Sequence, residues 1–174
     1  MRVPIVLAAI VAAPIPTPVG AGPRYHPPAE TRPVAGLRCS AREEARFGVH
    51  IELFANRRVV VVPAGIGIRP PLVRDGPYVR GGRCSYPLRT REPTGVVEIV
   101  PGTRPTLGTF FSLWGQPLSR TRLGTFRGRV SAFVYGRRWR GDPRSIPLTR
   151  HAQIVLEVGG YVPPHVFFLF RKSL

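Results

Sequence analysis

The fold is decided by the stretch VHIELFANRRVVVV, residues 49–62. Its first half, residues 49–54, alternates apolar and polar side chains, which is the period of a strand with one buried face. Its second half, residues 59–62, is a run of valines, and β-branched residues favour strands. The intervening residues 55–58 are suited to a turn. The stretch therefore predicts a β-hairpin.

Short segments with strand character recur along the rest of the chain, separated by glycine and proline. Strands are predicted at residues 95–100, 128–135, 154–158 and 166–170. Residues 69–82, which are rich in glycine, proline and charge, are predicted to form a loop. Closely spaced strands with almost no helix between them exclude a parallel α/β fold. The pattern predicts a mainly β domain, a compact antiparallel sandwich or barrel.

One segment has a helical period. Apolar side chains recur at i, i+3, i+4 and i+7 as Leu107, Phe110, Phe111 and Trp114. This spacing gives a single apolar stripe on a helix, and the preceding threonine is suited to cap its first turn. We expect one short helix over residues 106–115 that closes one side of the sheet.

The charge is strongly positive and almost entirely due to arginine. The net charge is +17, and among 26 basic residues only Lys172 is a lysine. The arginines are scattered, form no basic helix and accompany no nucleic-acid motif, so we do not expect specific nucleic-acid binding. Weak association with polyanions or acidic lipid surfaces is expected.

The first 21 residues have the order of a cleavable signal peptide. Arg2 is followed by an apolar run, too short to span a bilayer, and then by a proline-rich stretch that ends in Val19-Gly20-Ala21. We therefore predict a signal peptide at 1–21, a flexible leader at 22–33 and a single domain at 34–174. The protein is expected to be secreted or held in the cell envelope or periplasm, and not to be an integral membrane protein.

Two cysteines, Cys39 and Cys84, follow the predicted signal peptide. In an exported chain an even cysteine count indicates pairing, because that environment is oxidising. No Cys-x-x-Cys is present, which disfavours half of a zinc site. A Cys39–Cys84 disulfide is predicted.

The chain from residue 36 onward resembles a family of uncharacterised exported bacterial proteins. Its pattern includes His-x-His-Leu, Pro-Ala-Gly-Ile-Gly-Ile, Leu-His-Thr-His-Asp, Gly-Ile-Ile-His and Thr-Leu-Gly-Gln-Phe-Phe-x-x-Trp-Gly. The matching positions here are Cys39, residues 49–51, 63–68, 84–88, 106–115 and 141–148, and His151. The histidines of the family pattern imply a copper or zinc site in relatives.

This sequence departs from that pattern at the histidines. Gly48 stands at the first position of His-x-His, Arg89 and Arg91 replace both histidines of His-Thr-His, and Glu98 replaces that of Gly-Ile-Ile-His. Arginine has no lone pair to offer a metal ion. The comparison predicts a degenerate metal site that holds no metal.

The chain has no nucleophile elbow, phosphate-binding glycine loop or His-Glu-x-x-His motif, so no catalysis is expected. We predict a non-catalytic binding domain without a cofactor, with His50, Arg89, Arg91 and His151 as candidate ligand-binding residues. Two interpretations of the arginines stay open: they bind an anion bidentately, or they form internal salt bridges. The alternative function is copper or zinc binding through His50, His151, Glu52 and Glu98.

The signal peptide is directly testable. We expect the exported protein to lack residues 1–21 and to begin at Gly22, because Ala21 ends the small-residue cleavage region. Intact-mass analysis of the exported chain would measure this. Retention of Met1 would refute the assignment.

Overall fold

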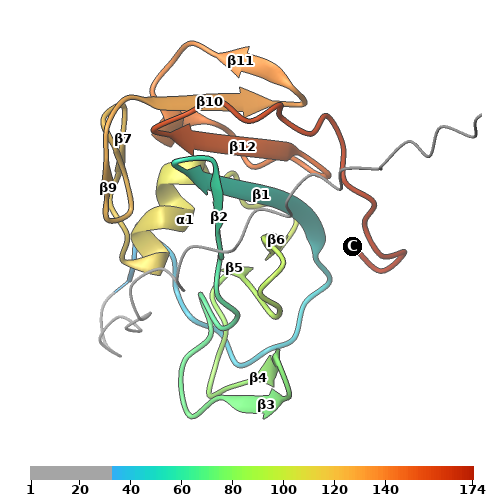
Figure 1. Cartoon of the computed structure of the whole chain (residues 1–174). Helices are drawn as coiled ribbons and strands as arrows, with labels where there is room; N and C mark the ends of the chain where they lie inside the picture. The colour runs from blue at the N-terminus through green and yellow to red at the C-terminus, as the bar shows by residue number, and fades with distance from the viewer. Residues whose placement is uncertain (1–32) are drawn as a thin grey trace, which may run out of the picture.

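The computed structural model describes residues 33–174. The predicted signal peptide, and all of the predicted leader except Pro33, lie outside the described residues. The described part is mainly β with one α-helix, as predicted. Figure 1 shows its main sheet above the helix and a small hairpin that projects at the opposite end.

The largest element is a mixed seven-stranded sheet. Its strands are β1 (Phe47–Ala55), β2 (Arg58–Val60), β5 (Leu88–Arg89), β6 (Val96–Ile99), β10 (Val130–Val134), β11 (Arg137–Trp139) and β12 (Gln153–Val158). The order is β11-β10-β12-β1-β6-β5, and β2 also pairs with β1. Since β11 and β5 end this order unpaired with each other, the described sheet is open and sandwich-like, not a closed barrel.

Strand β1 lies at the centre of the sheet and is paired along both of its edges. One edge pairs with β12, while the other pairs first with β6 and then with β2. The β1–β12 pair is parallel, whereas the other pairs are antiparallel. The predicted hairpin is confirmed as β1–β2. Its turn residues Asn56 and Arg57 both have positive φ, as a two-residue hairpin turn of this hand requires.

The inner face of the sheet is apolar. Val49, Ile51 and Leu53 of β1 are buried in one large hydrophobic cluster, together with Ile154 and Leu156 of β12. The outer face carries the alternate side chains, because successive residues of a strand point to opposite faces.

The second layer is formed by the helix, one short 3₁₀ turn and a small sheet. It comprises α1 (Leu107–Trp114), the 3₁₀ turn η1 (Pro143–Ser145), and the three-stranded sheet of β7 (Leu118–Ser119), β8 (Arg122–Leu123) and β9 (Phe126–Arg127). The helix begins after Thr106, whose hydroxyl accepts a hydrogen bond from the Thr109 N–H, and ends at Gly115 in the left-handed conformation. The predicted aromatic stripe is buried in the core. No helix among residues 33–174 is long and apolar enough to cross a membrane.

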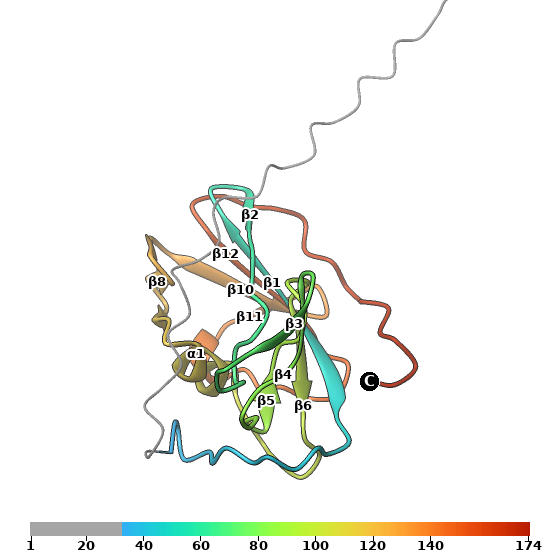
Figure 2. The ribbon, with the colours of Figure 1, turned by 90° about the horizontal axis from the view of Figure 1, so that it is seen from below.

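Two predictions made from the sequence are wrong. Residues 69–82 are not wholly a loop, since they contain the hairpin of β3 (Val73–Asp75) and β4 (Tyr78–Gly81). Residues 166–170 are not a strand. They belong to the C-terminal segment, residues 161–174, whose side chains contact the outer face of the sheet. Figure 2 shows this segment on the side of the sheet away from α1.

The predicted disulfide joins Cys39 to Cys84 and is accompanied by backbone pairing. The neighbouring residues Ser40 and Ser85 exchange two backbone hydrogen bonds of 2.9 and 2.8 Å. The bond spans 45 residues of sequence. The disulfide thereby holds residues 39–46, which precede the central strand β1, close to Cys84, which lies much later in the sequence.

Replacing both cysteines by alanine should lower the free energy of unfolding by about 4 kcal/mol. The reason is that the bond restricts a long loop in the unfolded chain. Urea unfolding of C39A/C84A against the oxidised parent would measure the loss. A difference below about 1 kcal/mol would contradict the stabilising role given to this bond.

Candidate functional site

The outer face of the sheet brings several of the predicted site residues into one row. Gly48 of β1 is directly opposite Glu98 of β6, and Glu98 is directly opposite Arg89 of β5. Residues in register across neighbouring strands point to the same face. Gly48, Glu98 and Arg89, which the sequence analysis singled out, therefore lie side by side.

Arg89 and Arg91 form an ion-pair cluster with two glutamates. Arg89 Nε donates to Glu98 Oε2 at 2.8 Å, and its Nη1 donates to Glu43 Oε2 at 2.9 Å. Arg91 Nη2 donates to Glu43 Oε1 at 3.0 Å. The Arg89 side chain is 3 % exposed and that of Glu98 is 11 % exposed. Both arginines thus pair with carboxylates of the same chain. This arrangement agrees with the interpretation that they form internal salt bridges.

A third arginine, Arg46, completes the cluster. It is buried, and its Nη1 donates to the carbonyl oxygens of Tyr86 and Pro87 at 3.2 and 2.9 Å. Burial, aided by the nearby charge of Arg89, lowers the pKa of Arg46 to about 10. The charge balance of the cluster is three arginines to two glutamates.

The two glutamates hold the arginines in the charged state. Burial alone would lower the pKa of Arg89, but its hydrogen bonds with Glu43 and Glu98 outweigh burial and raise that pKa. The hydrogen bond from Arg89 is also the main reason that the pKa of Glu43 is lowered. Arg89 and Glu43 are therefore charged at neutral pH, and Arg89 offers an added anion no unpaired guanidinium.

His50 is buried and engaged through both ring nitrogens. Its Nδ1 lies 2.7 Å from Gln153 Oε1 and its Nε2 lies 2.9 Å from the carbonyl oxygen of Thr94. Gln153 Nε2 is buried and has no hydrogen-bond partner among the described residues. Both ring nitrogens of His50 are thus within hydrogen-bond distance of a protein atom, whichever tautomer the ring adopts. His50 therefore has no free nitrogen for a metal ion.

The C-terminal segment covers both histidines. Phe168 stacks on His50 with ring centroids 3.8 Å apart, and Phe170 stacks on His151 at 4.7 Å. His151 Nε2 also lies 2.8 Å from the Leu174 oxygen. Phe170 occupies the space above Gly48, where a Cβ atom would come within 2.5 Å of Phe170 Cδ1. The absence of a side chain at position 48 is what lets the segment lie here.

The four residues of the alternative metal site do not converge. His50 is bound to Gln153, His151 to Leu174 and Glu98 to Arg89, while Glu52 accepts from His165 Nδ1 at 2.9 Å. Within residues 33–174 no group of three or more His, Cys, Asp or Glu side chains is placed to hold a metal ion. The geometry thus offers no basis for a copper or zinc centre on these residues.

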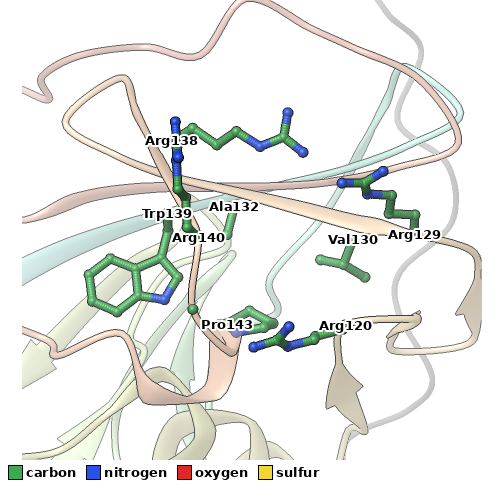
Figure 3. Close-up of a pocket in the computed structure, with 9 residues that line it drawn as sticks. Arg120, Arg129, Val130, Ala132, Arg138, Trp139, Arg140 and Pro143 are labelled. Carbon is green, nitrogen blue, oxygen red and sulfur yellow. The ribbon is translucent and has the colours of Figure 1, made fainter.

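A second site, which the sequence analysis missed, lies at the other end of the sheet. Here a cavity of about 430 Å³ is lined by Arg120, Arg129, Arg138, Arg140 and Trp139, with Val130, Ala132, Gly141 and Pro143. We call it the arginine pocket, and Figure 3 shows its side chains. Arg120 comes from the turn between β7 and β8, Arg129 precedes β10, and the other two arginines come from β11 and the residue after it.

The pocket exists because β11 is shorter than the strand beside it. The register pairs Trp139 with Ala132, and β11 ends at Trp139, whereas β10 extends back to Val130. The chain then turns away at Gly141 into η1, and Trp139 Nε1 donates to the Asp142 carbonyl oxygen at 3.2 Å. The edge of β10 beside Val130 is consequently not paired with β11, and the Val130 N–H donates instead to the Arg120 carbonyl oxygen at 2.8 Å. Val130 and Arg120 both line the pocket.

No carboxylate lines the arginine pocket. The guanidinium groups of its four arginines are exposed and make no side-chain hydrogen bond or ion pair with any other described residue. Seven of the eight described carboxylates bond elsewhere: Glu43, Glu52, Asp75, Glu92, Glu98, Asp142 and Glu157. Glu157 interacts electrostatically with Arg138, and Asp142 with Arg120, but neither carboxylate lines the cavity. The pocket is therefore a concave region with an excess of positive charge.

Only part of this site has a signal in the sequence. Residues 137–140 read Arg-Arg-Trp-Arg, but the sequence analysis treated the arginines as scattered. The turn is at Tyr135 and Gly136, both with positive φ, so Arg138 lies within β11. Arg120 and Arg129 are brought near residues 138–140 by the tertiary fold, and no local pattern in the sequence indicates this.

The Arg89–Glu98 pair should be a strong determinant of stability. Replacing Arg89 by methionine leaves the Glu98 carboxylate buried without its main partner, and we expect a loss of about 3 kcal/mol in the free energy of unfolding. The double variant R89M/E98L should lose less than R89M plus E98L measured separately, because the charge is removed together with its partner.

The matched control is R80M, which breaks the Arg80–Asp75 pair on the β3–β4 hairpin. Both side chains are more than 60 % exposed, at 66 % and 61 %. An exposed pair contributes at most about 1 kcal/mol. Urea unfolding of all variants gives the comparison, and an R89M loss no larger than that of R80M would contradict the structural role of Arg89.

Comparison with known proteins identifies no relative of this chain. No protein-family model matches it, and neither does any curated protein or solved structure. The function is therefore argued from the geometry and charge of its own surface.

Proposed function

We propose that this protein is a secreted or envelope-associated, non-catalytic domain that binds an anionic ligand in the arginine pocket. The observation that carries the proposal is that four arginines border one cavity beside Trp139 whose lining includes no carboxylate. The ligand that fits this chemistry carries several phosphate, sulfate or carboxylate groups.

Guanidinium groups suit such a ligand because each offers two parallel N–H donors to one anionic group. In the empty pocket the four positive charges repel one another, and a bound anion removes that repulsion. One exposed arginine would bind an anion weakly in water, but several around a concavity act on the same ligand. Trp139 adds an apolar wall for the uncharged part of the ligand.

The groups in the pocket favour binding over chemical conversion. Arginine stays protonated at physiological pH and cannot accept a proton, and the tryptophan indole is a donor only. The pocket lining includes no histidine, carboxylate, serine or cysteine. A general base or a nucleophile would have to come from the ligand.

The proposed compartment rests on two further observations. The first 21 residues have the composition of a signal peptide, and the Cys39–Cys84 bond is of a kind that persists in oxidising compartments. In such a compartment the available anions include the charged polymers of the cell envelope.

Calorimetric titration with pyrophosphate and with heparin tests the proposal. We expect both to bind the full-length exported protein and to raise its melting temperature. The double variant R129Q/R140Q should weaken pyrophosphate binding at least about tenfold, since each charged hydrogen bond contributes roughly 1.5–3 kcal/mol. The fold should survive, because both side chains are exposed.

The control variant R58Q/R104Q removes the same charge from two exposed arginines outside the pocket. It should change pyrophosphate affinity less than about twofold, because distant exposed charges are screened by salt. Equal weakening by both double variants would mean that the net charge, and not the pocket, attracts the anion. That result would refute the proposed site.

A further inference from the structure

The outward side of the C-terminal segment is unusually apolar. Seven large apolar side chains are exposed among residues 33–174, and five of them lie on this segment or on the adjoining β10–β11 turn: Tyr135, Tyr161, Val166, Phe167 and Leu169. Phe167 is 68 % exposed and Leu169 is 83 % exposed. Gathering of exposed apolar side chains on one part of a surface marks an interaction site.

The turn and the segment lie next to each other. A Cβ atom at Gly136 would come within 2.5 Å of Val166 Cγ1, so this turn packs directly against the start of the apolar row. Tyr135, the neighbour of Gly136 in the turn, has positive φ and is exposed. The five residues are thus brought together from two parts of the chain.

The segment is fixed in place by its alternate side chains. Phe168 and Phe170 point toward the sheet and stack on His50 and His151, while the alternate residues Phe167 and Leu169 are exposed. Arg171 forms an ion pair with Glu92, and His165 bonds Glu52. The exposed side chains are therefore carried by an anchored backbone, whose path is drawn in Figures 1 and 2.

The charge around this row is positive. Residues 161–174 contain Arg171, which pairs with Glu92, and Lys172, but no Asp or Glu, and Arg137 follows the neighbouring turn. A second copy of this chain, with its net charge of +17, would be repelled from such a surface. A partner with negative charge at its surface and an apolar layer below that surface is complementary to the row and its cations.

We propose that this row docks the protein on an anionic lipid bilayer. Phe167 and Leu169 would insert at the boundary between headgroups and acyl chains, as the apolar side chains of interfacial segments do. Tyr135 and Tyr161 suit the headgroup level because tyrosine combines an apolar ring with a polar hydroxyl. The adjacent cations attract acidic headgroups. Tyr161 lines a hollow with Arg129 and Arg138, so the row adjoins the arginine pocket there, but Phe167 and Leu169 do not line the pocket. The docking proposal does not depend on the function proposed for the pocket.

Co-sedimentation of the signal-peptide-free protein with vesicles tests the proposal. We expect binding to vesicles of phosphatidylcholine with 30–40 % phosphatidylglycerol, roughly the anionic content at which basic surfaces bind, and far weaker binding to pure phosphatidylcholine. F167S/L169S should lower the partition coefficient at least about tenfold, because two exposed apolar side chains no longer insert. Its melting temperature should match that of the parent, since both residues point to solvent.

Two control variants make the outcome specific. V73S removes an apolar side chain that is 60 % exposed on the β3–β4 hairpin, away from the row, and should leave vesicle binding unchanged. R129Q/R140Q removes two arginines of the arginine pocket and tests whether the pocket contributes to vesicle binding. We expect it to reduce vesicle binding only slightly. Loss of binding in R129Q/R140Q but not in F167S/L169S would show that the pocket holds the lipid headgroup and would overturn the proposal.

Sedimentation velocity tests whether the row instead binds a second copy of this chain. We expect a monomer for both the parent and F167S/L169S. A parent dimer that F167S/L169S dissociates would assign the row to self-association and would also overturn the proposal. Equal vesicle binding by the parent and F167S/L169S would also overturn the docking proposal.

Discussion

The pairing of β1 on both of its edges is the constraint on which the structure depends. This one strand hydrogen-bonds to β12 on one side and to β6 and β2 on the other, and its inward side chains supply the centre of the core. The same register places Gly48 against Glu98 and His50 against Gln153 on the opposite face. Core packing and the arrangement of the outer face are therefore set by a single alignment of strands.

Local sequence patterns were sufficient to predict the elements in which the spacing of apolar side chains fits only one kind of secondary structure. The β1–β2 hairpin and α1 follow from alternation and from the spacing of an apolar stripe, and both are confirmed. Residues 166–170 read Val-Phe-Phe-Leu-Phe, an apolar run that suits a strand, yet they lie across the face of the sheet instead of pairing at an edge. An apolar run indicates burial, but it does not specify whether strand pairing or a side-chain contact with a sheet face provides it.

The same limit applies to the sites. Pairing of Arg89 and Arg91 with Glu98 was among the interpretations open from the sequence, but Glu43 was not, because it is 46 residues before Arg89. The disulfide at Cys39 helps to bring that glutamate to the cluster. The arginine pocket needed three separate parts of the chain to meet at the end of β11. Such convergence depends on loop paths, which no local pattern encodes. The scarcity of carboxylates, visible in the composition, explains why these arginines leave an excess of positive charge.

Position 48 links two features of the outer face that would otherwise look unrelated. Phe170 and a side chain at residue 48 compete for the same volume. A chain of this architecture can therefore either display a side chain from the middle of its outer face or seal that face with its own tail, but not both. Exchange of one residue would convert a closed surface into an open one without altering the sheet, so divergence within such a fold can proceed through the tail while the core is kept intact.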